Sequence, residues 1–211
     1  SISDANPDNS LLVPPIMFKE QMDWLKNNGF TTMSLDEALE AKSTGKVPKK
    51  PVVVTFDDGY VDNYTVAYPI LKESGLKGTF FIITSMIDTS TSYMNSDMLK
   101  EMSNNGMSIE NHTHHHFDLP TGSIENQKAT IKKGQEILKE KVGVESKFLC
   151  YPTGKYTKDT ISVLDNLGVK AAVTTKGGIA HIGNGLYELR RVRMSPMNIE
   201  AFSSIFTSYM N

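Results

Sequence analysis

Short apolar runs and amphipathic segments alternate along the whole chain. The runs are rich in Val, Ile and Phe and are bounded by Gly or Pro, which is typical of buried parallel strands. The segments between them repeat apolar residues at helical spacing and end near glycine. We expect strands at 52–54, 78–84, 107–111, 147–151, 170–174 and 189–194, and helices at 17–28, from 34, 69–74, 95–105, 123–141, 157–167 and from about 198.

Helices of ten or more residues between successive strands predict βαβ units and a parallel sheet, so the expected fold class is α/β with six or seven units. No glycine fingerprint follows the first strand, and a small, distorted or incomplete (β/α) barrel therefore fits better than an open dinucleotide-binding sheet. We see no linker or repeat. We expect one domain over residues 1–211, in which the polar residues 1–15 form an extended lead-in on the surface.

Two acids, Asp57 and Asp58, follow the first expected strand, and a His-rich segment from His112 to His116 follows the third. Side chains at the ends of different parallel strands converge at one mouth of an α/β fold, and imidazole with carboxylate is a common ligand set for zinc. We interpret Asp58, His112 and His116 as three ligands of a catalytic metal with an open fourth position. Asp57 is then free to take a proton from water.

Each of these two clusters also has a purely structural interpretation. An Asp-Asp-Gly sequence is common in a turn that caps the following helix, and a His-rich segment can be a solvated loop. Four histidines within five residues are rare, however, and two of them four positions apart can bind one ion. The two clusters together favour the metal site.

Charge and composition exclude several classes of partner. The chain is 39% hydrophobic and 22% charged, with a net charge of −2 and no run of Lys or Arg, so it has no electrostatic footprint for nucleic acid. No apolar stretch approaches 18 residues, and we expect no membrane span in this chain.

The single cysteine, Cys150, excludes an internal disulfide. A start at Ser1 rather than Met fits processing or a trimmed chain, with any signal peptide then out of view.

The motifs that carry this chemistry resemble those of a known family. The segment Thr55-Phe56-Asp57-Asp58-Gly59, followed by His112-Thr113-x-x-His116, is similar to the first two motifs of the polysaccharide deacetylases of carbohydrate esterase family 4, the NodB-homology domain. The likeness continues through Tyr60-x-Asp62-Asn63-Tyr64, Gly78-Thr79-Phe80-Phe81 and Tyr151-Pro152-x-Gly154. The resemblance implies a distorted (β/α) barrel, here with about seven parallel strands.

The resemblance also implies a role for each matching residue. Asp57 becomes the general base, and Asp58, His112 and His116 become the metal ligands. Zn²⁺ is the usual metal of the family, and Co²⁺, Ni²⁺ or Mn²⁺ would fit the same ligands.

The reaction implied by the resemblance is metal-assisted hydrolysis of an N-acetyl group, or less often an O-acetyl group, on a polysaccharide that contains N-acetylglucosamine. This substrate class implies an extracellular or cell-surface location. The oxyanion of the tetrahedral intermediate would be stabilised by the metal and by a backbone N–H. We expect that N–H in the loop formed by Tyr151, Pro152, Thr153 and Gly154.

The third motif departs from the family pattern. The family places an arginine two residues before the proline, where it pairs with the base aspartate, but this position is Cys150. Arg191 and Arg193 share one face of an expected strand, and either could supply the charge. We favour Arg191, because Leu189-Arg190-Arg191-Val192 resembles the corresponding strand of a subgroup that lacks the usual arginine. A solvated strand edge is the alternative for both arginines.

The leucine-histidine pair that supplies the general acid of the family is also absent. The chain is closest to the permuted subgroup that includes the poly-N-acetylglucosamine deacetylases of bacterial biofilms, in which the acid histidine lies upstream of the first helix. We therefore expect the acid before Ser1, with His181 as the alternative within the chain. His114 and His115 are expected to lie outside the ligand set.

Two other readings of the function stay open. A non-catalytic, metal-containing carbohydrate-binding domain would explain Cys150 and the missing acid. An unrelated metal phosphoesterase or a metal-free glycosidase fits less well. A phosphoesterase usually gathers more carboxylates around two ions, and the two carboxylates of a glycosidase lie about 5 to 9.5 Å apart across the sugar.

Overall fold

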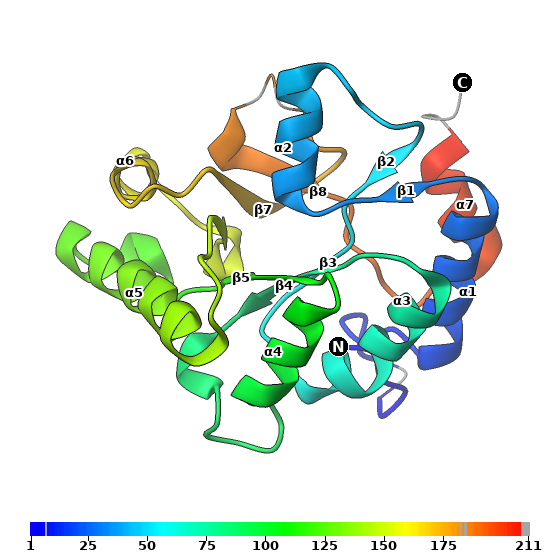
Figure 1. Cartoon of the computed structure of the whole chain (residues 1–211), viewed down its shortest axis with the longest axis horizontal. Helices are drawn as coiled ribbons and strands as arrows, with labels where there is room; N and C mark the ends of the chain where they lie inside the picture. Colours follow the sequence, from blue (N-terminus) through cyan, green and yellow to red (C-terminus); the bar gives the residue numbers. More distant parts are fainter. Residues whose placement is uncertain (7, 182, 184, 208–211) are drawn as a thin grey trace.

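Six short strands form one parallel sheet, in the same order as along the chain (Figure 1). The computed structural model describes residues 1–6, 8–181, 183 and 185–207. The sheet is curled into a half-barrel, which confirms the expected α/β class and the incomplete (β/α) barrel. The strands are β3 (Thr55–Phe56), β4 (Thr79–Ile82), β5 (Ser108–Asn111), β6 (Phe148–Cys150), β7 (Ala171–Gly177) and β8 (Leu189–Arg191).

The apolar run that we expected to form the first strand is divided between two sheets. Its start, β2 (Pro51–Val52), pairs in parallel with β1 (Thr31–Thr32) in a separate two-stranded sheet. Its end is β3, which pairs with β4. The half-barrel therefore has six strands where about seven were expected, because Val53 leaves the ladder and packs against the apolar cluster on the inner face of the sheet.

Helices connect the strands from β3 to β7 and cover the outside of the sheet (Figure 1). The capping box predicted at Ser34 is confirmed, since Ser34 and Glu37 each accept a hydrogen bond from the backbone N–H of the other. The helix expected to reach residue 141 does so in two parts, because α5 (Ile124–Ile137) is followed directly by a π-helical turn, Leu138–Val142. The α-helices are α1 (Pro15–Asn27), α2 (Leu35–Thr44), α3 (Tyr68–Ser74), α4 (Ser96–Asn104), α5 (Ile124–Ile137), α6 (Lys158–Asn166) and α7 (Ile199–Thr207).

The core has an outer and an inner part because side chains alternate across each strand. Phe80 and Ile82 of β4 belong to the large outer cluster with residues of α1, α3, α4 and α7. Phe81, between them, faces a separate inner cluster that includes Phe148 of β6 and Leu35 of α2. The inner face of the sheet is therefore filled by side chains, and chemistry is confined to the rim.

The first residues of the chain do not form a single extended lead-in. Ile2 and Val13 pair in a parallel β-bridge, and both are only 6% exposed. Their apolar side chains join the outer cluster, which draws the segment back on itself. The backbone N–H of Ile2 also donates to Asp62, five residues after the Asp57 position.

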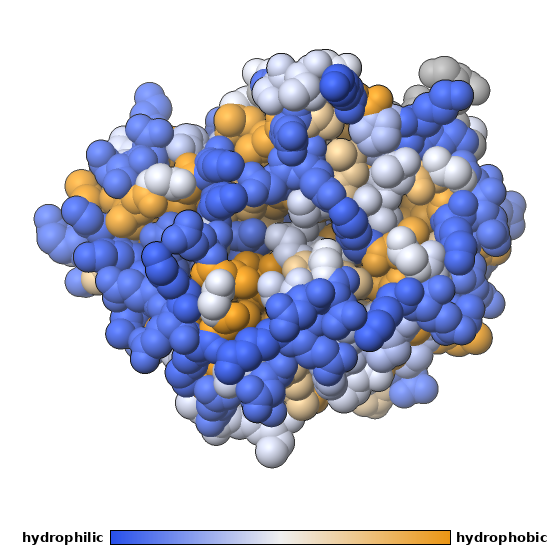
Figure 2. All heavy atoms as spheres, viewed as in Figure 1, coloured by the Kyte–Doolittle hydropathy of each residue, from blue (hydrophilic) through white to orange (hydrophobic). Residues whose placement is uncertain are grey.

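Polar and charged side chains cover most of the face shown in Figure 2, and apolar atoms are visible in separate areas. Within the described ranges, we find no helix with the length and apolar character needed to cross a membrane.

Parallel strands bring their carboxyl ends to one edge of the sheet. Asp57 and Asp58 follow β3, His112 follows β5, Tyr151 follows β6, and Arg191 ends β8. The fold thus gathers residues from four strands on one rim.

Candidate active site

A tight turn after β3 brings two neighbouring acids toward the same place. Asp58 and Gly59 both have left-handed backbone conformations, with φ of 72° and 85°, and the N–H of Gly59 donates to the carbonyl of Asp57 at 2.9 Å. Successive residues on a strand point to opposite sides. The left-handed turn cancels that alternation, so Asp57 and Asp58 can both serve one site.

Asp58, His112 and His116 converge as the sequence predicted. Oδ1 of Asp58 lies 3.4 Å from Nε2 of His112 and 3.6 Å from Nε2 of His116. These separations are too long for strong hydrogen bonds between charged groups. Two ligand atoms at about 2.1 Å from a tetrahedral ion lie about 3.4 Å apart, which matches both distances. The three side chains therefore fit a metal ion.

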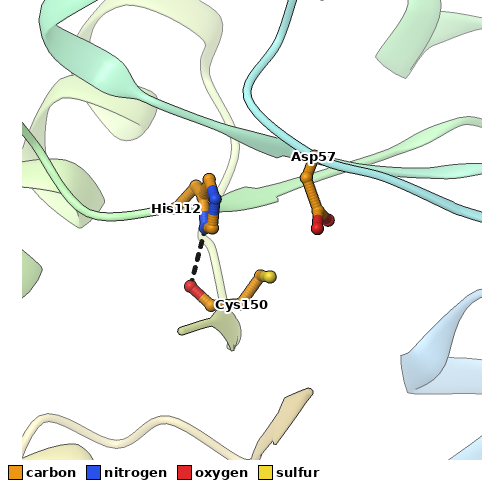
Figure 3. A group of neighbouring side chains, drawn as sticks. All are labelled: Asp57, His112 and Cys150. Atoms are coloured by element: carbon orange, nitrogen blue, oxygen red, sulfur yellow. Dashed lines mark hydrogen bonds between the residues drawn. The ribbon is translucent and has the colours of Figure 1, made fainter. Parts of the chain in front are cut away.

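His112 is fixed by a contact on its other ring nitrogen. Its side chain is buried, and Nδ1 lies 2.7 Å from the carbonyl oxygen of Cys150 (Figure 3). Since a carbonyl only accepts, Nδ1 must carry the proton and donate. In the neutral imidazole, this places the lone pair on Nε2, the atom that faces Asp58, as a metal ligand requires.

The His-rich loop reaches the site through two more left-handed residues, Thr113 (φ 65°) and His116 (φ 54°). The backbone N–H of His116 donates to the hydroxyl of Thr113, and the N–H of Thr113 donates to the side chain of Asn111. Asn111 is fully buried and also donates to the carbonyl of Ile131 on α5. Sequence reasoning missed this role of Asn111, because the residue occupies an ordinary strand position.

Arg191 contacts Asp57 in the bidentate geometry that suits a guanidinium and a carboxylate. Its Nη1 and Nη2 atoms lie 2.8 and 2.7 Å from the two carboxylate oxygens. Further bonds run from Arg191 to the hydroxyl of Thr55 and to the carbonyl of Thr174. Arg193, the other candidate in the sequence, is exposed.

Cys150 explains how an arginine from another strand can reach this position. Its side chain is buried, and its Sγ accepts a hydrogen bond from Nη2 of Arg191 at 3.2 Å. The small thiol leaves room for the guanidinium. The charge that the family pattern places on β6 is thus supplied from β8.

Asp57, His112 and Cys150 also lie close enough together to suggest a second metal group (Figure 3). Arg191 already occupies the cationic position there, because it binds both Asp57 and Cys150. Burial, followed by the charge of Asp57, raises the pKa of the Cys150 thiol, which disfavours the thiolate form that binds metals. Of the two groups, the Asp58 group is therefore the one that could hold a metal ion.

The pKa of Asp57 reflects two opposing causes. Burial acts to raise it, but the charge of Arg191 and its hydrogen bonds outweigh burial and lower the pKa of Asp57 to about 2. The side chain of Asp57 is 31% exposed and that of Arg191 is 18% exposed, so the carboxylate is more accessible to a substrate than the guanidinium that binds it.

The loop after β6 leaves one backbone donor without an assigned bond. The N–H groups of Tyr151 and Gly154 donate to Val173 and Tyr151, and Pro152 has no N–H. Thr153 has a left-handed φ of 57°, and no described residue accepts from its N–H. Of the four loop residues named from the sequence, Thr153 is therefore the one with a free donor.

The remaining histidines lie outside the ligand group. Nδ1 of His114 is 3.0 Å from the hydroxyl of Thr84, and His115 is exposed. His181 is exposed in the segment between β7 and β8.

This half-barrel, with an Asp/His/His group and a neighbouring carboxylate on its rim, has the form of a NodB-homology hydrolase. A family model described as polysaccharide deacetylase matches residues 44–172, which is more than half of the chain. The chain therefore belongs to the polysaccharide deacetylase family.

Two curated proteins are similar in sequence. YxkH of Bacillus subtilis (strain 168), whose name places it among the polysaccharide deacetylases, is 36% identical over 95% of this chain and 72% of its own length. The poly-beta-1,6-N-acetyl-D-glucosamine N-deacetylase of Staphylococcus aureus (strain MRSA252) is 30% identical over 84% of this chain and 66% of its own length. This chain thus spans only part of both relatives.

A solved structure is similar in fold. The Streptococcus pyogenes deacetylase PplD in complex with acetate matches with a TM-score of 0.93 at 34% identity, over 97% of this chain and 94% of that chain. The half-barrel is therefore the fold of a deacetylase domain.

Proposed function

We propose that this chain is a metal-dependent hydrolase that removes N-acetyl groups from N-acetylglucosamine units of an extracellular or cell-surface polysaccharide. The observation that carries the proposal is the Asp58, His112 and His116 group beside an aspartate held by Arg191. The substrate class is supported by the name of the staphylococcal relative, which specifies an N-acetylglucosamine polymer.

Zn²⁺ is the proposed metal, since two imidazole nitrogens and one carboxylate oxygen suit it, with Co²⁺, Ni²⁺ or Mn²⁺ as alternatives for the same ligands. When bound, such an ion lowers the pKa of water and polarises a carbonyl group.

Asp57 is proposed to accept the proton of the attacking water. With a pKa near 2 it is ionised at physiological pH, so a proton acceptor is always present. The same low pKa makes Asp57 a weak base, because general bases work best when their pKa lies near the working pH. Asp57 is therefore proposed to assist the proton transfer by its position more than by its basicity. Arg191 fixes that position.

The Thr153 N–H is proposed to donate to the oxyanion that forms from the acetyl carbonyl. Its neighbour Gly154 supports this geometry, since a Cβ added at Gly154 would overlap the side chain of Thr175 on β7. The close approach of the loop to β7 requires glycine at this position.

The proposal is tested by measuring acetate released from N-acetylglucosamine oligomers and, in parallel, from an O-acetylated glycan. We expect acetate release from the N-acetylglucosamine oligomers, with a free amine as the other product. We expect little release from the O-acetylated glycan. Release from the O-acetylated glycan alone would overturn the N-acetyl assignment. Bound metal with no release from either would favour the non-catalytic carbohydrate-binding alternative.

A further inference from the structure

Two tyrosines stack on each other immediately after the turn that carries the candidate ligand Asp58. Tyr60 follows the Asp58–Gly59 turn, and Tyr93 comes from the segment between β4 and α4. Their ring centroids lie 4.9 Å apart at an interplanar angle of 27°. Both rings are partly exposed.

Backbone contacts hold Tyr93 in place rather than leaving it on a free loop. Tyr60 and Tyr93 pair in an isolated antiparallel bridge. On either side, the N–H of Val61 donates to Ser92 at 2.9 Å and the N–H of Met94 donates to Gly59 at 3.0 Å. Met94 is buried in the outer cluster and anchors the segment. The Tyr60–Tyr93 pair is thus preorganised, which lowers the entropy cost of binding a ligand.

The phenol groups of this pair differ from those of the other described tyrosines. Tyr64, Tyr68, Tyr151, Tyr156 and Tyr187 each donate to, or accept from, a residue elsewhere in the protein. Among the described residues, no group outside the pair bonds to the phenol of Tyr60 or Tyr93. Buried or half-buried tyrosines usually find a partner for the O–H. Apart from the contact between the two phenols, their hydroxyl groups are therefore available to a ligand.

The stacked rings and the hydroxyl groups of Tyr60 and Tyr93 form one partly exposed aromatic surface. A neutral aromatic surface with exposed hydroxyl groups suits a hexopyranose ring, which has an apolar C–H face and a polar edge of hydroxyls.

We propose that Tyr60 and Tyr93 bind a pyranose ring of the glycan chain next to the unit that is deacetylated. This inference rests on the proposed function and extends it, because it assigns a second sugar position and so a preference for polymer over single sugars. The ring would stack on the tyrosine surface, and its hydroxyls would bond to the two phenols.

The test compares Tyr93→Leu with wild type on N-acetylglucosamine oligomers and on 4-nitrophenyl acetate, a small acetyl ester without a sugar. We expect KM for the oligomers to rise about 3- to 10-fold, as the loss of one aromatic contact predicts, with kcat for the ester unchanged. Tyr64→Leu is the matched control, because Tyr64 also stacks on a tyrosine but bonds to Glu101 on α4, and it should leave both values unchanged. An unchanged KM in Tyr93→Leu would overturn the proposal.

A binding measurement separates this inference from the proposed function. In an NMR titration of the wild-type protein with N-acetylglucosamine oligomers, the ring signals of Tyr60 and Tyr93 should shift while those of Tyr64 stay in place. Such shifts without acetate release would sink the deacetylase and keep the sugar position. Acetate release without shifts at Tyr60 and Tyr93 would keep the deacetylase and overturn the sugar position. This measurement uses the wild-type protein, so it decides even if Tyr93→Leu does not fold.

Discussion

The position and charge of Asp57 depend mainly on one other side chain, Arg191. The two residues are 134 positions apart, and their ion pair outweighs the effect of burial on the pKa of Asp57. In the folded protein Asp57 loses its charge only near pH 2, whereas its ordinary pKa is 3.8. The pair therefore stabilises the fold fully above pH 3.8, and this contribution is lost as the pH falls toward 2.

Arg191→Met should move the acidic limb of the kcat/KM profile to higher pH. Without the guanidinium, burial remains as the main cause and raises the pKa of Asp57 above its wild-type value of about 2. Because a base must be unprotonated to act, activity is then lost at a higher pH. Arg193→Met, at an exposed position two residues away, is the control. If the pH profile of kcat/KM in Arg191→Met superimposed on that of Arg193→Met, Arg191 would not set the charge of Asp57.

Among the elements, the loops at the carboxyl ends of the strands carry the unusual backbone. Asp58, Thr113, His116 and Thr153 are four of the six described non-glycine residues with positive φ. Such conformations cost energy and persist where surrounding contacts enforce them. Helix α5 provides one of these contacts, because Gly134 lets it approach Asn111, which in turn binds the Thr113 N–H.

Gly134→Ala should destabilise the protein, although alanine normally favours a helix interior by about 1 kcal/mol over glycine. The added Cβ would overlap the Asn111 side chain, which is bonded at both ends and cannot move away. We expect a loss of about 1–3 kcal/mol in the free energy of unfolding, measured with urea.

A double-mutant cycle provides the control for this prediction. Asn111→Ala removes the overlapping side chain, so Gly134→Ala should cost much less in that background. Equal costs in both backgrounds would contradict the proposed overlap.

The sequence predicted the helices and strands well where local signals exist. The Ser34 cap and the alternation of strands with helices are examples, since each rests on neighbouring residues. It failed for residues 1–15, whose course is set by the burial of Ile2 and Val13 in a distant cluster. It also failed at Val53, because period-2 patterns cannot show that a run of apolar residues changes sheets.

At the scale of the whole molecule, the half-barrel is bridged on its rim by a side chain. Strands β3 and β8 are the edges of the six-stranded sheet, and Arg191 of β8 bonds to Thr55 and Asp57 at β3. The parallel topology could be predicted, because it follows from helices between strands. Spacing alone could not distinguish Arg191 from Arg193 as the partner of Asp57. The preference for Arg191, whose guanidinium bonds to Cys150, came from the family resemblance.

Zn²⁺ should stabilise the whole fold through the Asp58 group. A ligand that binds only the folded state at about 100 times its Kd adds about 2.7 kcal/mol to the free energy of unfolding. We expect this gain, read as a higher Tm, in wild type and in Asp97→Ala, whose side chain is 89% exposed. Asp58→Ala should lose it, and an equal gain in that variant would place the ion elsewhere.

The most direct measurement is acetate release from N-acetylglucosamine oligomers together with the metal content of the same sample. Wild type loaded with Zn²⁺ should hold one ion and release acetate, a chelator should abolish both, and Asp57→Asn should keep the ion while losing most of the release. Acetate release that survives removal of the metal, or that is unchanged in Asp57→Asn, would contradict a metal held by Asp58, His112 and His116 with Asp57 as its base.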